Sequence, residues 1–123
     1  LQDLPDTPNR VDGSGLSRYN LFTPRTNVKL LEKLRDMIPE ERLLSFMAIG
    51  GKAGTLRGMY KDKEPFIFAK SGTVSGVYNQ TGYLKTKSGK TLLFSFMNNN
   101  FNSYASPVRK EVERVLTWVH ENY

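Results

Sequence analysis

The run Thr91–Met97 constrains the fold most strongly, because apolar residues occupy both of its alternating positions. A strand places successive side chains on opposite faces, so this run would be apolar on each face. The apolar residues of the run are Leu92, Leu93, Phe94, Phe96 and Met97. Such a strand must be covered on both sides, and helices are the obvious cover. The run therefore predicts a sheet that lies between helices.

Two other runs have the composition of strands, and both precede this one in the chain. They span Phe66–Ser71 and about Val74–Thr86. The segment Lys87–Lys90 contains Ser-Gly and predicts a hairpin turn that leads into Thr91. Because a tight turn joins neighbouring strands in opposite directions, we expect three antiparallel strands in an open sheet.

Two helices are predicted before these strands. Thr23-Pro24 combines a capping hydroxyl with a proline at the first helical position, which predicts a helix over Pro24–Met37. Pro39 ends this helix and opens a second one over Glu40–Met47. Two glycines end the second helix, and they are Gly50 and Gly51.

A third helix is predicted after the strands, where Ser106-Pro107 repeats the pattern of a hydroxyl followed by proline. Residues Leu1–Leu21 are rich in aspartate, proline and glycine and are predicted to form a loop. The fold class that follows is an α/β (α+β) sandwich, in which helices flank three antiparallel strands.

The composition limits the kind of protein. A chain of 123 residues with 38% hydrophobic residues forms one domain or a piece of one. The net charge of +6 comes from scattered residues, with no basic run longer than Arg109-Lys110, so we expect no nucleic-acid partner. The sequence has no cysteine and a single histidine, so we expect no metal and no cofactor. No apolar run approaches the ~20 residues that cross a bilayer, so we expect no membrane span.

The clearest chemical motif is Lys70-Ser71-Gly72, which directly follows the apolar residues Phe66–Ala69. A strand would carry a cation and a hydroxyl group to its end, where the glycine allows close approach to the backbone. Serine acyl-transfer enzymes of the penicillin-binding type use a Lys-Thr/Ser-Gly strand in this way. The motif therefore suggests a substrate groove along this strand.

Three segments together resemble one family. Asp12–Leu21, Gly50–Leu56 and Ala69–Asn79 are similar, in this order, to signatures of the D-alanyl-D-alanine carboxypeptidase/endopeptidase family, the low-molecular-mass class C penicillin-binding proteins. The resemblance spans nearly the whole chain and is weakest in residues 1–10 and after residue 98. It implies part of a DD-peptidase/β-lactamase-like domain, with peptidoglycan stem peptides and β-lactams as ligands.

The resemblance also implies roles for individual residues. Lys70 would place a fixed positive charge beside the substrate carboxylate, and Ser71 would keep the hydroxyl donor of the more usual threonine. Gly72 would keep the groove open, and the backbone N–H of Thr73 would form half of an oxyanion hole. The substrate would lie along the strand as an added β-strand.

A second set of residues would line a pocket for the side chain of the peptide donor. By resemblance this set comprises Ser14, Leu16 and Arg18, and the guanidinium group of Arg18 is suited to a carboxylate. The segment Val11–Arg18 read by itself predicts a tight turn in which Asp12-Gly13 favours a positive φ.

Part of the family's chemistry is absent from these residues. The family attacks its substrate with a serine in Ser-x-x-Lys and completes the site with Ser-x-Asn. No serine in the chain is followed by lysine three residues later or by asparagine two residues later. We therefore expect both motifs upstream of Leu1, so that residues 1–123 are the C-terminal segment of a penicillin-binding DD-peptidase domain and are inactive alone. The parent enzyme would act in the bacterial periplasm or cell envelope.

Two other functions remain open at this point. The chain would alternatively be a non-catalytic module that binds cell-wall peptide or an anionic polymer. A serine hydrolase of β-lactamase or esterase type on the same scaffold is a weaker hypothesis. Because an incomplete sheet leaves an apolar edge open, we also expect self-association of this segment.

Overall fold

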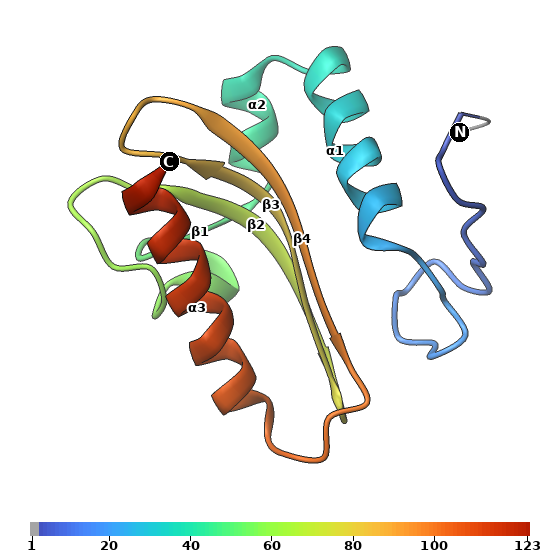
Figure 1. The fold of residues 1–123 in the computed structure, drawn as a ribbon. Helices are drawn as coiled ribbons and strands as arrows, with labels where there is room; N and C mark the ends of the chain where they lie inside the picture. Colours follow the sequence, from blue (N-terminus) through green and yellow to red (C-terminus); the bar gives the residue numbers. More distant parts are fainter. Residues whose placement is uncertain (1–2) are drawn as a thin grey trace.

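The computed structural model describes residues 3–123 and is built around a four-stranded antiparallel sheet (Figure 1). The strands follow one another across the sheet in chain order, and they are β1 (Ala48–Ile49), β2 (Ile67–Val74), β3 (Val77–Lys85) and β4 (Thr91–Asn99). The three predicted antiparallel strands are therefore confirmed. β1 is an addition that the sequence does not predict, and it pairs only with Phe68 and Ala69 of β2.

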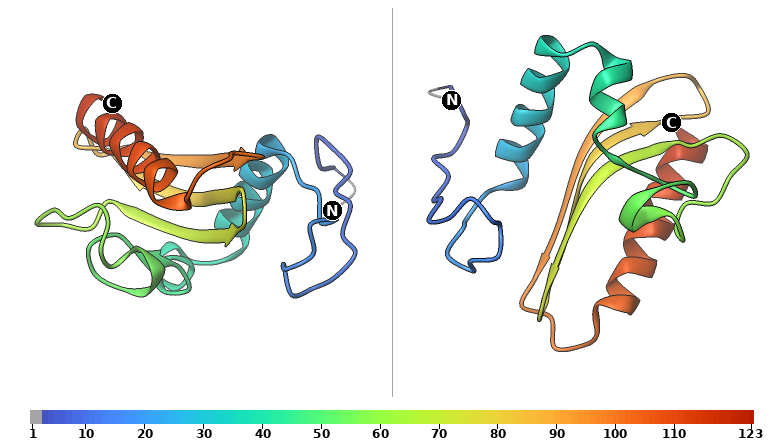
Figure 2. Two further views of the ribbon diagram at one scale, coloured as in Figure 1. Left: turned by 90° about the horizontal axis from the view of Figure 1, so that it is seen from below. Right: turned by 180° about the vertical axis from the view of Figure 1, so that it is seen from behind.

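Helices cover both faces of the sheet, as the apolar pattern of β4 predicts. α1 (Pro24–Met37) and α2 (Glu40–Ser45) lie on one face, and α3 (Ala105–Asn122) lies on the other (Figure 2). Leu93 of β4 packs into the core under α1 and α2. Its neighbours on the opposite face pack into the core under α3, and they are Leu92, Phe94 and Phe96. The fold is thus an α+β sandwich.

The predicted start of α1 is confirmed at the level of single atoms. Thr23 is the N-cap, its Oγ1 accepts a hydrogen bond from the N–H of Thr26, and Pro24 is the first helical residue. Thr23 Oγ1 also donates to Asp6. The same signal is wrong for the last helix. α3 begins at Ala105 with Tyr104 as the N-cap, so Ser106 and Pro107 lie inside the first turn, where proline needs no N–H partner.

The hairpin between β2 and β3 lies later in the chain than predicted. β2 continues beyond Ser71 to Val74, and the turn is formed by Ser75 and Gly76. Gly76 has a φ of +70°, which favours glycine in a two-residue turn. The correction matters for function, because Gly72 and Thr73 are strand residues rather than part of a turn.

The end of α2 also differs from the prediction. The helix stops at Ser45, and the glycines at positions 50 and 51 do not end it. Instead, the chain turns into β1 at Ala48, because its backbone groups pair with those of β2. The expected loop at the start of the chain is observed over residues 3–21 apart from an isolated bridge between Asn9 and Leu21, while residues 1–2 lie outside the described range.

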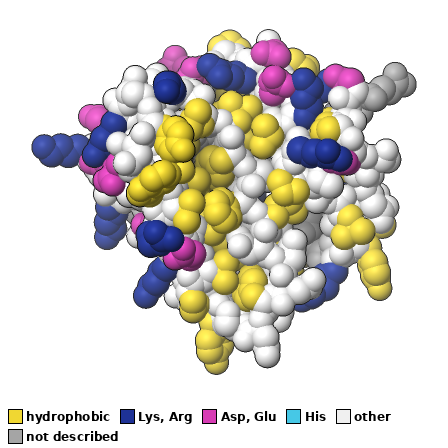
Figure 3. All heavy atoms as spheres, viewed as in Figure 1, with side chains coloured by type: hydrophobic (Ala, Val, Ile, Leu, Met, Phe, Trp, Pro, Cys, Tyr) yellow, Lys and Arg dark blue, Asp and Glu magenta, His cyan; other side chains and the backbone are white. Residues whose placement is uncertain are grey.

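The surface carries an apolar band along the edge of the sheet that β4 forms, beside α3. Figure 3 shows apolar side chains gathered down the middle of this view, with charged groups mainly around the periphery. Within residues 3–123, β4 has a strand partner on one side only, which is β3. No helix in the described part of the chain is long and apolar enough to span a bilayer.

Candidate functional site

One edge of β2 is open where the Lys-Ser-Gly motif lies. β1 pairs with β2 no further than Ala69, and none of the strands in residues 3–123 continues along that side. On this side the N–H of Gly50 donates to the carbonyl of Ile67 at 2.9 Å. Because backbone groups alternate along an antiparallel strand, Ser71 and Thr73 direct their N–H and C=O groups to the same side. On this side, the backbone groups of Ser71 and Thr73 have no strand partner among the described residues.

The side chains of the motif are accessible at this edge. Lys70 and Gly72 are exposed, as is Thr73, and Ser71 is half-buried. The ammonium group of Lys70 donates a hydrogen bond to the carbonyl of Ser71. No carboxylate among residues 3–123 forms an ion pair with Lys70. The hydroxyl of Ser71 lies 2.8 Å from Thr55 Oγ1.

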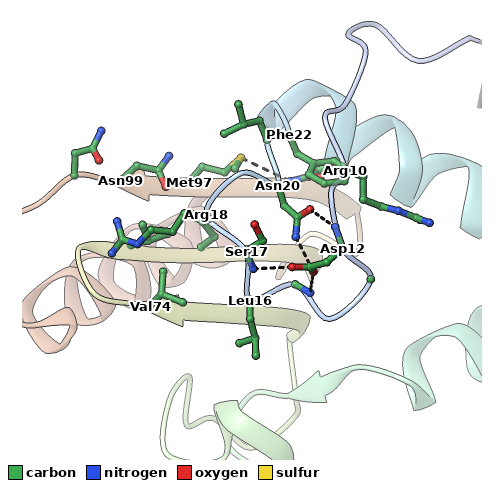
Figure 4. A pocket seen from close by; sticks show the side chains of 17 residues that line it. Arg10, Asp12, Leu16, Ser17, Arg18, Asn20, Phe22, Val74, Met97 and Asn99 are labelled. Carbon is green, nitrogen blue, oxygen red and sulfur yellow. Dashed lines mark hydrogen bonds between the residues drawn. The ribbon is translucent and has the colours of Figure 1, made fainter.

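The loop that contains the second predicted set of residues is closed at its base. Asn9 and Leu21 form two backbone hydrogen bonds, of 2.9 and 2.8 Å, so that the loop between them begins and ends at one point. Inside the loop, Asp12 accepts hydrogen bonds from the side chain of Asn20 and from the N–H groups of Gly15 and Ser17 (Figure 4). These bonds, that from Asn20 above all, lower the pKa of the Asp12 carboxyl.

A cavity of about 620 Å³ lies between this loop and the ends of the strands (Figure 4). Leu16 and Arg18 line it from the loop, and Val74 and Asn79 line it from β2 and β3. The guanidinium group of Arg18 donates to the carbonyl of Ser75 in the β2–β3 turn. The loop is thus joined to the end of the strand that carries the motif.

Not every predicted residue lies in this cavity. Ser14 is exposed outside its lining, and the Ser14 hydroxyl donates to Asp12 Oδ1 at 3.1 Å. The lining includes Val74 of β2 but none of the four preceding residues, Lys70 to Thr73. The structure therefore brings Leu16 and Arg18 together with the end of β2, whereas the motif faces the neighbouring open edge.

Asp12 organises the loop, a role that was not predicted. The positive φ predicted for Asp12-Gly13 is wrong, because the residue with a positive φ in this loop is Gly15, at +78°. An aspartate just before several small or polar residues is a signal for side-chain to backbone bonding, which replaces a backbone turn. This signal would have indicated Asp12 as the centre of the loop.

His120 belongs to the core rather than to this site. It is 8% exposed and stacks on Phe66 with ring centroids 3.9 Å apart. Its Nδ1 lies 2.6 Å from the carbonyl of Lys85, which can only accept, so Nδ1 is the donor. The single histidine is therefore used to fix α3 to the end of β3.

The comparison with protein families agrees with the resemblance of the three segments. Residues 7–120 match the model of the D-Ala-D-Ala carboxypeptidase 3 (S13) family. The chain belongs to this family, and the predicted kinship with penicillin-binding carboxypeptidases is confirmed.

Two curated relatives give the extent of the match. The chain is 32% identical over 97 residues to the D-alanyl-D-alanine carboxypeptidase DacB of Haemophilus influenzae. This match covers 76% of this chain and 20% of the relative. The chain is 35% identical over 101 residues to the D-alanyl-D-alanine carboxypeptidase of Actinomadura sp. (strain R39), covering 76% of this chain and 19% of the relative. The chain thus spans about one fifth of the length of these relatives.

The fold also matches solved structures. Crystal structures of penicillin binding protein 4 (dacB) from Haemophilus influenzae superpose with a TM-score of 0.82 at 25% sequence identity. The match covers 98% of this chain and 29% or 30% of the solved chains. One of these structures is a complex of that protein with a novel β-lactam.

Proposed function

We propose that residues 1–123 form one wall of the active site of a serine D-Ala-D-Ala carboxypeptidase/endopeptidase that acts on peptidoglycan peptides. The observation that carries the proposal is the Lys70-Ser71-Gly72 motif on an open strand edge, with exposed Lys70 and Gly72. A peptide that adds to this edge can pair with the backbone groups of Ser71 and Thr73, which have no strand partner on this side within residues 3–123. The family relationship gives the class of peptide, because the relatives are D-alanyl-D-alanine carboxypeptidases.

Each residue of the motif has a separate role in this proposal. Lys70 supplies a positive charge to the substrate carboxylate without taking part in bond making, and Ser71 donates its hydroxyl proton to the same carboxylate. Gly72 has no atom within 4 Å of the position of a Cβ, so the groove beside it is open. The N–H of Thr73 contributes to the oxyanion hole.

The cavity beside the loop binds the side chain of the peptide donor. Leu16 and Arg18 line this cavity, and Arg18 is suited to an acidic side chain there. Ser14, which lies outside the lining, contributes through its bond to Asp12, which holds the loop. A peptide that occupied both the open edge and the cavity would run along β2 past Val74.

The reactive serine and the general base come from a part of the enzyme outside residues 1–123 in this proposal. The absence of Ser-x-x-Lys and Ser-x-Asn from the sequence supports it, as does the greater length of the relatives. The substrate class places the enzyme in the bacterial periplasm or cell envelope. β-Lactams would acylate the same missing serine.

Acylation by a labelled penicillin tests the proposal. The 123-residue chain should remain unlabelled, and the full-length polypeptide that contains it should be labelled. In the full-length polypeptide, Lys70→Ala should lower the acylation rate on the order of 10²-fold, because a preorganised charge is lost. Lys110→Ala, an exposed lysine on α3, is the matched control and should leave the rate unchanged.

The outcomes separate the proposal from its alternative. Labelling of the 123-residue chain alone would contradict the proposal that the reactive serine lies outside these residues. A full-length polypeptide that binds a D-Ala-D-Ala peptide reversibly, but neither hydrolyses it nor reacts with penicillin, would establish the non-catalytic binding module instead.

A further inference from the structure

One side chain outside the predicted site contacts the hydroxyl of the motif. Thr55 Oγ1 lies 2.8 Å from Ser71 Oγ. Within residues 3–123 it is the only side chain from elsewhere in the chain that forms a side-chain hydrogen bond to the segment from Lys70 to Thr73. Thr55 is itself exposed, so this pair of hydroxyl groups lies at the surface beside the open edge of β2.

The backbone of Thr55 is held by the residues on either side of it. Thr55 lies in a short 3₁₀ helix, η1 (Gly54–Leu56). Gly54 has a φ of +67°, and a Cβ there would lie 2.9 Å from the Cβ of Ala48 in β1. Leu56 is completely buried in the core under α3. Thr55 is therefore presented from a rigid segment, at the point where β1 stops pairing with β2.

The backbone of Ser71 is also held in place. Ser71 lies opposite Gln80 of β3, which is completely buried. The Oε1 atom of Gln80 accepts hydrogen bonds from the hydroxyls of Tyr60 at 3.0 Å and Tyr78 at 2.9 Å. With both backbones fixed, the hydroxyl of Ser71 is oriented mainly by rotation about its Cα–Cβ bond, and Thr55 restrains that rotation.

A hydroxyl group has one proton to donate and can accept at the same time. If Ser71 donates to Thr55, its proton is not free for a substrate. If Thr55 donates to Ser71, the proton of Ser71 is free, and the donated bond strengthens it as a donor. A carboxylate can only accept, so its arrival beside Ser71 selects the second arrangement.

We propose that Thr55 is a positioning residue that donates a hydrogen bond to Ser71 and thereby aims the proton of Ser71 at the carboxylate of the bound peptide. This inference rests on the proposed function, because it needs Ser71 to bind that carboxylate. It adds to the site a residue that the Lys-Ser-Gly motif does not contain. It also assigns a direction to the hydrogen bond between the two hydroxyl groups.

A double-mutant cycle in the full-length polypeptide tests the inference. The variants are Thr55→Val, Ser71→Ala and the double variant, assayed on an acyl-D-Ala-D-Ala peptide. Ser71→Ala should lower kcat/KM by about 10-fold or more, as expected for a hydrogen bond to a charged group. Thr55→Val should lower it by about 2- to 10-fold, mainly through KM, and should have no further effect in the Ser71→Ala background. Thr55→Ser, which keeps the donor, should restore the wild-type value.

The controls distinguish failure of this inference from failure of the proposed function. Thr117→Val on α3 is the matched control and should leave kcat/KM unchanged, and thermal unfolding checks that each variant is folded. If Ser71→Ala has no effect, or the wild-type polypeptide hydrolyses no D-Ala-D-Ala peptide, the proposed function is overturned and this inference with it. If Ser71→Ala is impaired but Thr55→Val is not, or the two effects multiply, or Thr55→Ser fails to restore activity, only the role of Thr55 is overturned.

Discussion

The ammonium group of Lys70 bends over the edge of β2 onto the carbonyl of Ser71, the next residue in the chain. Two features of the surroundings favour this contact. No described carboxylate is close enough to form an ion pair with Lys70, and the carbonyl of Ser71 has no strand partner within residues 3–123. The same carbonyl is an acceptor that an added peptide strand would use. Binding of a peptide would therefore move Lys70 from the backbone to the carboxylate of that peptide.

A second feature at the scale of single residues is the carboxyl group of Asp6, which should make the stability of the fold depend on pH. Asp6 accepts hydrogen bonds from Arg25 and from Thr23, the N-cap of α1. The bond from Arg25 contributes most to lowering the pKa of Asp6 from 3.8 to about 2. A carboxyl whose pKa is lowered by folding stabilises the fold above its unfolded pKa, and this contribution is lost as the pH falls.

Asp6→Asn should therefore lower the free energy of unfolding at pH 7, and the difference from wild type should shrink as the pH falls from about 4 to about 2. Urea unfolding at a series of pH values measures it. Asp36→Asn, an exposed aspartate near the other end of α1, is the control. An Asp6→Asn difference that stays constant down to pH 2 would contradict the ion pair.

At the scale of elements, β2 and β3 are in close contact where Gly82 faces Ala69. A Cβ at Gly82 would lie 2.2 Å from the carbonyl oxygen of Phe68 and 2.5 Å from the Cα of Ala69. These are backbone atoms, so no side chain can rotate away to make room. The contact lies one residue before Lys70 and therefore sets the path of the strand that carries the motif.

Gly82→Ala should destabilise the chain by about 3 kcal/mol, because the added methyl group forces the two strands apart. Chemical denaturation of both proteins measures the difference. Gly13→Ala is the matched control, since no atom lies within 4 Å of its Cβ position and its φ is not positive. A Gly82→Ala variant as stable as wild type would show that the strands can separate here without cost.

Local sequence signals predicted an element correctly where the residues that stabilise it are close together in the chain. The hydroxyl of Thr23 and the ring of Pro24 act within one helical turn, and the start of α1 was predicted correctly. β1 could not be predicted, because its two residues form a strand only through pairing with β2, about 20 residues later. The end of β2 was misplaced for a similar reason: the ladder to β3 carries Gly72 and Thr73 into the strand despite their low apolar content.

At the scale of the whole molecule, the sheet has one long edge without charge. The residues of β4 include no charged side chain, and within residues 3–123 only β3 pairs with this strand. Natural proteins normally protect an exposed edge with charged residues or proline. The apolar band of Figure 3 runs close to this edge. The expected self-association of the 123-residue chain is therefore best assigned to β4.

Sedimentation velocity over a wide concentration range should detect this self-association as a dimer formed through β4. An antiparallel pairing of two β4 strands centred on Ser95 places Thr91 of one copy opposite Asn99 of the other. The double variant Thr91→Lys/Asn99→Lys would therefore place like charges face to face and should weaken association by about 10-fold or more. Ser103→Lys/Asn122→Lys adds the same charge elsewhere and is the control. A wild-type chain that stays monomeric throughout would contradict the assignment.

The sequence motifs were sufficient to predict the family, but the arrangement of the candidate site could be predicted only in part. The spacing of the Lys-Ser-Gly motif and the segment around Arg18 indicated the family, which the family match confirms. The contacts of Arg18 with the β2–β3 turn and of Thr55 with Ser71 join residues 57 and 16 positions apart. Such contacts depend on how the elements pack, which a short sequence pattern does not encode.

The closed base of the loop between Asn9 and Leu21 has a practical consequence. Both ends of the segment meet at one bridge and its interior is bonded around Asp12, while Arg18 bonds it to the β2–β3 turn. The segment is therefore a compact unit that contacts the rest of the described chain at few points. Exchanging this unit between family members would alter the wall of the cavity and leave the sheet untouched. If the proposed function holds, such an exchange would change which peptides the enzyme accepts while the sheet keeps its structure.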